Sequence, residues 1–155
     1  MDKYDHYCAI LNQCDKELDE LYHKYAVHHH LSDAALWILY AIYDANEMIT
    51  QSDICNTWFF TRQTIHTALK GLEQQGIIEV TSIPTNKKSK QLHFTKDGKQ
   101  TAQQLLTPLL EAEKNVFTAF SDEENELYAQ LSKKRCTLLR DFLEENFSRN
   151  EKKEN

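Results

Sequence analysis

Residues 61–76 read Thr61-Arg-Gln-Thr-Ile-His-Thr-Ala-Leu-Lys-Gly-Leu-Glu-Gln-Gln-Gly76 and carry the clearest structural pattern in the chain. Their apolar residues follow the i, i+3, i+4, i+7 spacing of an amphipathic helix: Ile65, Ala68, Leu69 and Leu72. Thr61 is a favoured residue for capping the start of a helix, and Gly76 for ending one in a left-handed conformation. The segment therefore predicts a helix with one apolar face and one polar face.

The polar face carries side chains that suit hydrogen bonding to phosphates and base edges. They are Arg62, Gln63, His66, Thr67 and Lys70. A short helix is expected just upstream, at residues 51–58. A two-stranded hairpin with a lysine-rich tip is expected downstream, with strands at residues 77–82 and 91–94. Helix, turn, helix and basic hairpin are the parts with which a winged helix grips duplex DNA.

Helices are also expected on both sides of this region, because helix formers dominate and only three Gly and two Pro interrupt them. The first spans about residues 4–27 and the second follows a Ser32 cap. A long helix starts at Thr95, and the last follows the Ser121–Glu124 capping box. The predicted fold class is mainly α with a small β-hairpin wing, a winged helix-turn-helix. The expected core residues are Leu36, Leu39, Ile54, Ile65, Leu69, Leu72 and Ile78.

The formal net charge of −6 looks unsuited to a DNA-binding protein, but the charge is unevenly distributed. Residues 57–99 carry seven Lys and Arg against three Asp and Glu. Residues 1–56 carry three basic and ten acidic side chains, and residues 100–155 carry eight basic and eleven acidic side chains. Because local charge decides where a polyanion docks, the helix and hairpin are the expected surface for double-stranded DNA.

Two motifs and the order of the helices resemble the MarR family (multiple antibiotic resistance regulators). The motifs are the Leu72–Ile78 turn and, after the basic hairpin, the segment Leu92–Gly98. The resemblance implies a homodimeric transcription regulator, with helix 61–75 in the major groove and the wing in the neighbouring minor groove. The expected target is an inverted repeat, and repression is the simplest outcome. The DNA-facing residues it implies are Gln51, Ser52, Arg62, Gln63, Thr64, His66, Thr67, Lys70, Lys87, Lys88 and Lys90.

One departure concerns the wing, where the family commonly carries Asp-x-Arg and this chain has Asn86-Lys87-Lys88. Lysine lacks the planar fork of arginine, so the wing is expected to clamp phosphates. The resemblance also implies an N-terminal dimerisation helix at residues 1–30, a DNA-binding domain at 31–98 and C-terminal dimerisation helices at 99–148. A charged, disordered tail is expected at 149–155. The expected dimer surface comprises Ile10, Leu18, Leu131, Leu138, Leu139, Phe142 and Leu143.

Aromatic residues raise the hypothesis of a pocket for a small-molecule effector, against the alternative that they belong to the core. The four candidates are Trp37, Tyr40, Trp58 and Phe59. The run His28–His30 is interpreted as a solvated loop in preference to a metal site, because consecutive histidines do not converge. A thiol switch at Cys8 or Cys14 is a further alternative, as is a winged helix that binds another protein in place of DNA.

The sequence contains none of the phosphate-binding, zinc-hydrolase or nucleophile motifs of common enzyme classes, so neither an enzymatic activity nor a cofactor is expected. It has no apolar run long enough to cross a bilayer and no leader pattern. The expectation is a cytoplasmic protein without a membrane partner.

Overall fold

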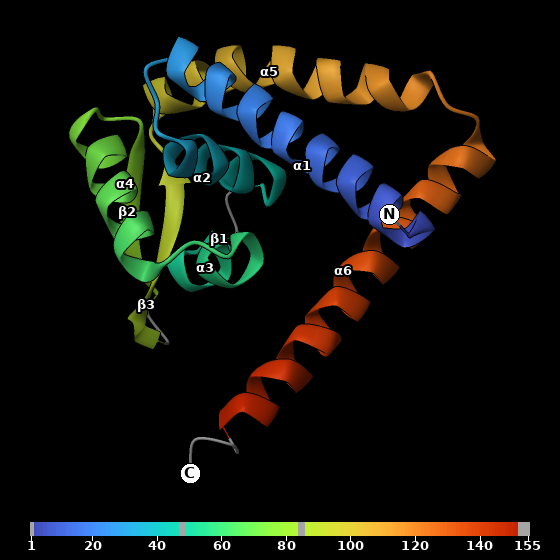
Figure 1. Ribbon diagram of the computed structural model, residues 1–155. Helices are drawn as coiled ribbons and strands as arrows, with labels where there is room; N and C mark the ends of the chain where they lie inside the picture. The colour runs from blue at the N-terminus through green and yellow to red at the C-terminus, as the bar shows by residue number, and fades with distance from the viewer. Residues whose placement is uncertain (1, 47–48, 84–85, 152–155) are drawn as a thin grey trace. The chain divides into compact units, whose positions relative to one another are not determined.

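A computed structural model describes residues 2–46, 49–83 and 86–151, and the side chains of residues 86–88 and 148–151 lie outside that description. The chain divides into two compact units, Met1–Pro108 and Leu109–Asn155. The described elements, in order, are α1 (Lys3–His28), α2 (Asp33–Asp44), β1 (Ile49–Thr50), α3 (Gln51–Trp58), α4 (Arg62–Gln74), β2 (Ile78–Ile83), β3 (Asn86–Phe94), α5 (Lys96–Thr118) and α6 (Asp122–Glu151). The predicted mainly helical fold with a small wing is confirmed (Figure 1).

Local capping chemistry explains where the helices of the first unit begin and end. The Ser32 hydroxyl accepts a hydrogen bond from the backbone N–H of Ala35 at 3.2 Å, which caps α2. The Thr61 hydroxyl accepts from the N–H of Thr64 at 3.1 Å, which caps α4. Gly76 has a φ of 69° and ends α4 as predicted, because few residues other than glycine adopt that conformation without strain.

The sheet differs from the predicted two-stranded hairpin in two ways. It has three antiparallel strands in the order β1-β3-β2, with Ile49 of β1 opposite Leu92 of β3. In addition, β3 starts at Asn86, whereas the sequence placed the returning strand at residues 91–94. The polar residues before 91 join the ladder because backbone groups make its hydrogen bonds, so an apolar pattern underestimates the strand length.

The core of the first unit lies around α2, which Figure 1 draws among α1, α3, α4 and the sheet. Seven residues of α2 are buried, so the helix is apolar on most of its surface. All seven core residues predicted from the sequence are buried, which confirms that prediction: Leu36, Leu39, Ile54, Ile65, Leu69, Leu72 and Ile78. The aliphatic side chains of Ile38, Ile42, Leu92 and Leu106 are also fully buried in this core.

The start of α5 is attached to the end of α4 by a set of short hydrogen bonds. The Thr95 hydroxyl donates to the carbonyl oxygen of Gly76 at 2.6 Å and accepts from the N–H of Gly98 at 2.9 Å. The N–H of Thr95 donates to the carbonyl oxygen of Ile77 at 3.1 Å. Gly98 lies so close to Ile77 that a Cβ atom at this position would overlap the Ile77 carbonyl oxygen. The contact requires glycine because no other residue leaves that space empty.

The connection between α3 and α4 contains a residue in an unusual conformation. Phe59 is the C-cap of α3, has a φ of 56° and leaves 81% of its surface exposed. A left-handed conformation costs a residue with a Cβ roughly 1–2 kcal/mol. The connection Trp58-Phe59-Phe60 therefore contains a strained backbone conformation at Phe59.

We expect the substitution Phe59→Gly to stabilise the protein by about 1 kcal/mol, because it removes this strain and exposed apolar surface. The gain is limited by the extra freedom that glycine has in the unfolded chain. Chemical denaturation with matched slopes for both proteins measures the change. Phe60→Gly serves as the control, since Phe60 is not among the described residues with a positive φ and should lose stability. A destabilised Phe59→Gly variant would contradict the strain argument.

The second unit consists of the end of α5 and the whole of α6. The predicted capping box is present: Ser121 Oγ accepts from the N–H of Glu124 at 3.2 Å, and the Glu124 carboxylate accepts from the N–H of Ser121 at 2.9 Å. Because α6 continues to Glu151, the structure extends the helix into the tail expected from residue 149. The described part of the chain contains no helix apolar enough, over a sufficient length, to span a membrane.

Candidate DNA interface

The α4 helix separates its side chains as the sequence pattern predicts. Ile65, Leu69 and Leu72 are buried in the core. All six DNA-facing candidates on this helix are exposed: Arg62, Gln63, Thr64, His66, Thr67 and Lys70. The Gln63 amide also lies 3.5 Å from the Thr67 hydroxyl, one turn along the helix. The exposed face of α4 therefore offers an arginine, a lysine and several neutral hydrogen-bonding groups.

The start of α3 is held by a reciprocal cap. The N–H of Asp53 donates to the Thr50 hydroxyl at 3.2 Å, and the Asp53 carboxylate accepts from the N–H of Thr50 at 2.9 Å. This capping box places Gln51 and Ser52 in the first turn of α3, where free backbone N–H groups favour anions.

A polar groove of about 240 Å³ joins three parts of the candidate interface, and we call it the α3–wing groove. It is lined by Gln51, Ser52, Cys55, Arg62, Ser89 and Lys90. Residues from the start of α3, the start of α4 and the wing strand β3 thus meet around one depression. With two cations and several hydroxyl and amide groups, the α3–wing groove has the chemistry of a contact with DNA, to phosphates as well as to base edges.

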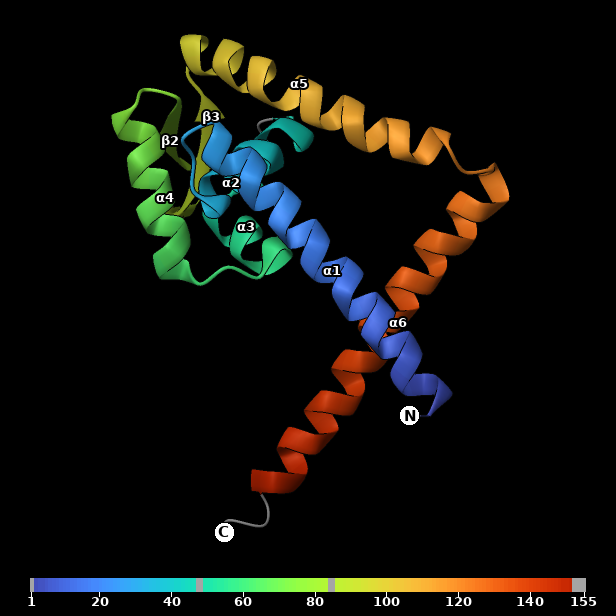
Figure 2. The same ribbon diagram turned by 45° about the horizontal axis from the view of Figure 1, so that its top comes forward.

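A second groove, of about 380 Å³, runs between α4 and the wing, and we call it the α4–wing groove. Its lining residues are Gln51, His66, Leu69, Lys70, Glu73, Val80 and Lys90. Both views of the molecule show α4 beside the strands of the wing (Figures 1 and 2). The two grooves share Gln51 and Lys90, so four of the predicted cationic or histidine side chains, including Arg62, border one continuous region.

Sequence reasoning did not identify every residue of these grooves. Cys55, Ser89, Glu73 and Val80 line them, although none was a candidate. Ser89 alone had a usable signal, because it lies between the lysines of the wing. Among the wing candidates, Lys90 lines both grooves, whereas the side chains of Lys87 and Lys88 lie outside the described residues.

The aromatic candidates lie apart from these grooves. Trp37 stacks on Trp58 with ring centroids 4.8 Å apart, and Tyr40 contacts both rings. Tyr22 of α1 adds a further ring, 4.8 Å from Trp37. Each of these rings is half-buried, whereas the side chain of Phe59 is exposed. The stacked rings fill the space between them, as in a small core.

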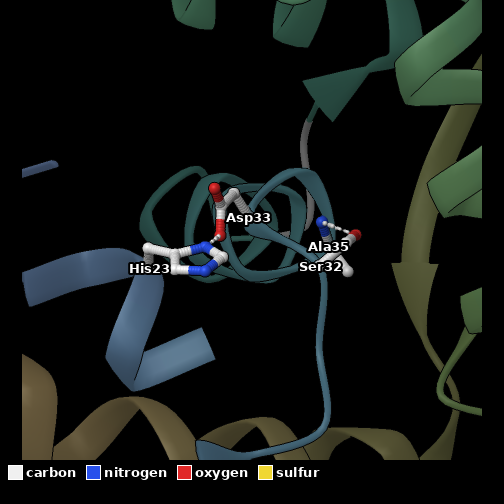
Figure 3. A network of polar contacts seen from close by, with 4 residues as sticks. All are labelled: His23, Ser32, Asp33 and Ala35. Atoms are coloured by element: carbon white, nitrogen blue, oxygen red, sulfur yellow. Dashed lines mark hydrogen bonds and ion pairs between the residues drawn. The ribbon is translucent and has the colours of Figure 1, made fainter. Parts of the chain in front are cut away.

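The end of α1 attaches to the rest of the first unit through polar contacts. His23 Nδ1 lies 2.9 Å from Asp33 Oδ1, next to the Ser32 cap of α2 (Figure 3). The Tyr25 hydroxyl donates to the carbonyl oxygen of Leu105 at 2.7 Å, and burial raises the pKa of this phenol. The ring of His29 packs on Tyr25. The pKa of His29 is lowered, mainly by burial and to a lesser extent by the charges of His28 and His30.

The histidine run and the cysteines were the candidates for a metal site and a thiol switch. Within residues 2–46, 49–83 and 86–151, no three His, Cys, Asp or Glu side chains converge as metal ligands would. Cys8 and Cys14 are exposed, and all four cysteines are free thiols.

Comparison with models of protein families matches residues 29–89 to the MarR family. Comparison with curated proteins gave no match. The fold is similar to S. aureus MepR in DNA-binding conformation, with a TM-score of 0.73, 21% identity, and 85% of this chain and 98% of that chain covered. It is also similar to the transcriptional regulator BldR from Sulfolobus solfataricus, with a TM-score of 0.66, 20% identity, and 86% and 96% covered. A third similar structure is Streptococcus pneumoniae FabT in complex with DNA, with a TM-score of 0.66, 19% identity, and 88% of this chain and 99% of that chain covered.

Proposed function

We propose that the chain is a DNA-binding transcription regulator of the MarR family, which the match of residues 29–89 to that family supports. In this proposal the chain acts as a homodimer that represses a promoter by occupying an inverted repeat. The observation that carries the proposal is the convergence of Gln51, Ser52, Arg62 and Lys90 in the α3–wing groove, next to the exposed polar face of α4. Cations and hydrogen-bond donors from three elements at one surface suit a duplex, which presents a phosphate backbone beside readable base edges.

The proposed dimer is supported by apolar side chains that a single chain leaves exposed. On α1 they include Ile10 and Leu18, and on α6 they include Leu131, Leu138, Leu139, Phe142 and Leu143. Soluble monomers rarely expose rows of large apolar groups, so a second copy is the proposed cover for each of these two helices. Two α4 helices would then enter successive major grooves about 34 Å apart, which requires a short inverted repeat.

Release from DNA is proposed to follow the binding of a small effector that prefers a different spacing of the two lobes. We assign this contact to the junction of α2 and α3, where Trp37, Tyr40 and Trp58 offer half-buried aromatic surface and Phe59 an exposed ring. Solved relatives of this fold include MepR in a DNA-binding conformation and FabT in complex with DNA, which supports duplex DNA as the partner.

The direct test is a gel-shift titration with the DNA upstream of the protein's own gene, at about 0.15 M salt and with unrelated duplex as competitor. We expect a discrete complex that survives the competitor and weakens steeply as salt increases. A DNA complex whose affinity does not depend on salt would favour a winged helix that binds proteins. The same conclusion would follow if no DNA complex formed and a protein partner were captured instead.

Two substitutions distinguish base reading from phosphate clamping. We expect Arg62→Ala to weaken binding to the specific site by about 10-fold to 100-fold, with a smaller effect on random DNA. Lys90→Ala should weaken binding to both, and lower the slope of log affinity against log salt by about 1. Fluorescence anisotropy across a salt series measures both quantities. Equal, small effects of the two variants on specific and random DNA would contradict the assignment of α4 as the recognition helix.

A further inference from the structure

The chain contains only three glycines, and the fold accounts for two of them. Gly76 has a φ of 69°, and a Cβ atom on Gly98 would overlap Ile77. Gly71 has neither constraint: it lies inside the α4 helix, and a Cβ atom there would meet nothing within 4 Å. Glycine is among the least favourable residues for a helix interior, second only to proline. The described part of the chain therefore provides no packing reason for glycine at position 71.

Gly71 lines a groove of about 630 Å³ between α2 and α4, which we call the α2–α4 groove. One wall is the first turn of α2, at residues 32–35, and the other is a row on α4. That row consists of Gln63, Thr64, Thr67, Ala68, Gly71 and Leu72, and is followed by the C-cap residue Gln75. Since Gln63, Thr64 and Thr67 are DNA-facing candidates, the α2–α4 groove is continuous with the proposed interface and lies along the same helix.

The chemistry of the α2–α4 groove differs from that of the α3–wing groove. Its lining is mainly apolar, with contributions from Leu31, Ala35 and Phe60, and it includes neither lysine nor arginine. Its one carboxylate, Asp33, already contacts His23 (Figure 3). Such a surface is unsuited to a phosphate, but it suits the apolar feature of a major groove, which is the C5-methyl group of thymine.

We propose that the α2–α4 groove receives this apolar edge of the DNA and that Gly71 determines how closely α4 approaches it. The inference rests on the proposed DNA-binding function and adds a residue that contributes to specificity by having no side chain. A Cβ atom at position 71 would extend into the space that the DNA occupies, without disturbing the free protein.

The test compares Gly71→Ala and Gly71→Leu with the unmodified protein, using a duplex that the unmodified protein binds specifically. We expect Gly71→Ala to raise the melting temperature by about 3 °C, because alanine favours the helix. The same variant should bind the duplex about five-fold more weakly, and Gly71→Leu should bind it about fifty-fold more weakly or worse. The salt slope should stay unchanged, because no phosphate contact is lost.

The control is Gln100→Ala, an exposed position on α5 that lines none of the three grooves. It also introduces an alanine into a helix, with a smaller gain in helix propensity than at position 71, and should leave DNA affinity unchanged. A second arm replaces each thymine of the duplex with deoxyuridine, which lacks only the C5-methyl group. At least one replacement should weaken DNA binding by the unmodified protein. The same replacement should cause no further loss of DNA affinity in the Gly71→Leu variant.

Unchanged DNA affinity of both Gly71 variants, or a wild-type affinity that is indifferent to every thymine methyl group, would overturn the inference. A lower melting temperature for Gly71→Ala would overturn it as well, because a packing role would then explain the glycine. If the unmodified protein binds no duplex with a steep salt dependence, the proposed function itself fails, which is a distinguishable result.

Discussion

Replacing Gly98 with alanine is expected to destabilise the protein by about 4 kcal/mol or more, a large part of the 5–15 kcal/mol typical of folded domains. The new Cβ atom would overlap the Ile77 carbonyl oxygen and lie 2.8 Å from Ile77 Cα. These are backbone atoms at the junction of α4, β2 and α5, so they cannot move aside as a flexible side chain could. The hydrogen bonds from Thr95 to Gly76 and Ile77 would be lost together with this contact.

Urea denaturation and the melting temperature measure this effect, and Gly76→Ala is the matched control. Gly76 has a φ of 69°, but a Cβ atom there meets nothing within 4 Å. Its substitution should therefore cost only the left-handed strain, roughly 1–2 kcal/mol. Equal losses for Gly98→Ala and Gly76→Ala would show that the close approach between α5 and Ile77 is not required.

Introducing two glutamates on α6, Leu131→Glu with Phe142→Glu, is expected to convert the protein into a monomer and to weaken DNA binding by about 100-fold or more. The two residues are eleven apart, which places them on one face of the helix, together with Leu127 and Leu138. In the single chain, Leu131 is 54% exposed and Phe142 is 61% exposed. Burying two carboxylates against a second copy would be strongly unfavourable. The loss of affinity follows because a monomer engages only one half-site, without the gain from a linked second contact.

Analytical ultracentrifugation gives the oligomeric state, and anisotropy with the specific duplex gives the affinity. Lys133→Glu changes the charge by the same amount on another face of α6, and this control should remain dimeric and bind DNA. A double variant that remains dimeric would place the interface elsewhere. A monomer with unchanged affinity would separate dimerisation from DNA binding.

Much of the first unit could be predicted from short stretches of sequence. The caps at Ser32, Thr50 and Thr61 act within three residues of themselves, so the starts of α2, α3 and α4 follow from local hydrogen bonding. The left-handed end of α4 at Gly76 is similarly local. The polar and apolar faces of α4 were also predictable, because a helical period of 3.6 residues assigns each side chain to a face.

Other features depend on contacts between segments that are far apart in the chain. The pairing of β1 with β3 and the early start of β3 arise from backbone hydrogen bonds, which side-chain patterns do not encode. The left-handed Phe59 and the mutual packing of Trp37 with Trp58 are likewise set by how α3 meets its neighbours.

Propensity, capping and periodicity act over a few residues, so the amino-acid sequence was enough to predict the helices, the buried faces of α2, α3 and α4, and the positive charge of residues 57–99. Only the tertiary structure brought Arg62, Gln51 and Lys90 to one groove, and only it distinguished the three glycines from one another. The physical reason is that a groove and a steric overlap are distances between elements, and such distances are set when the core packs α2, α3, α4 and the sheet together.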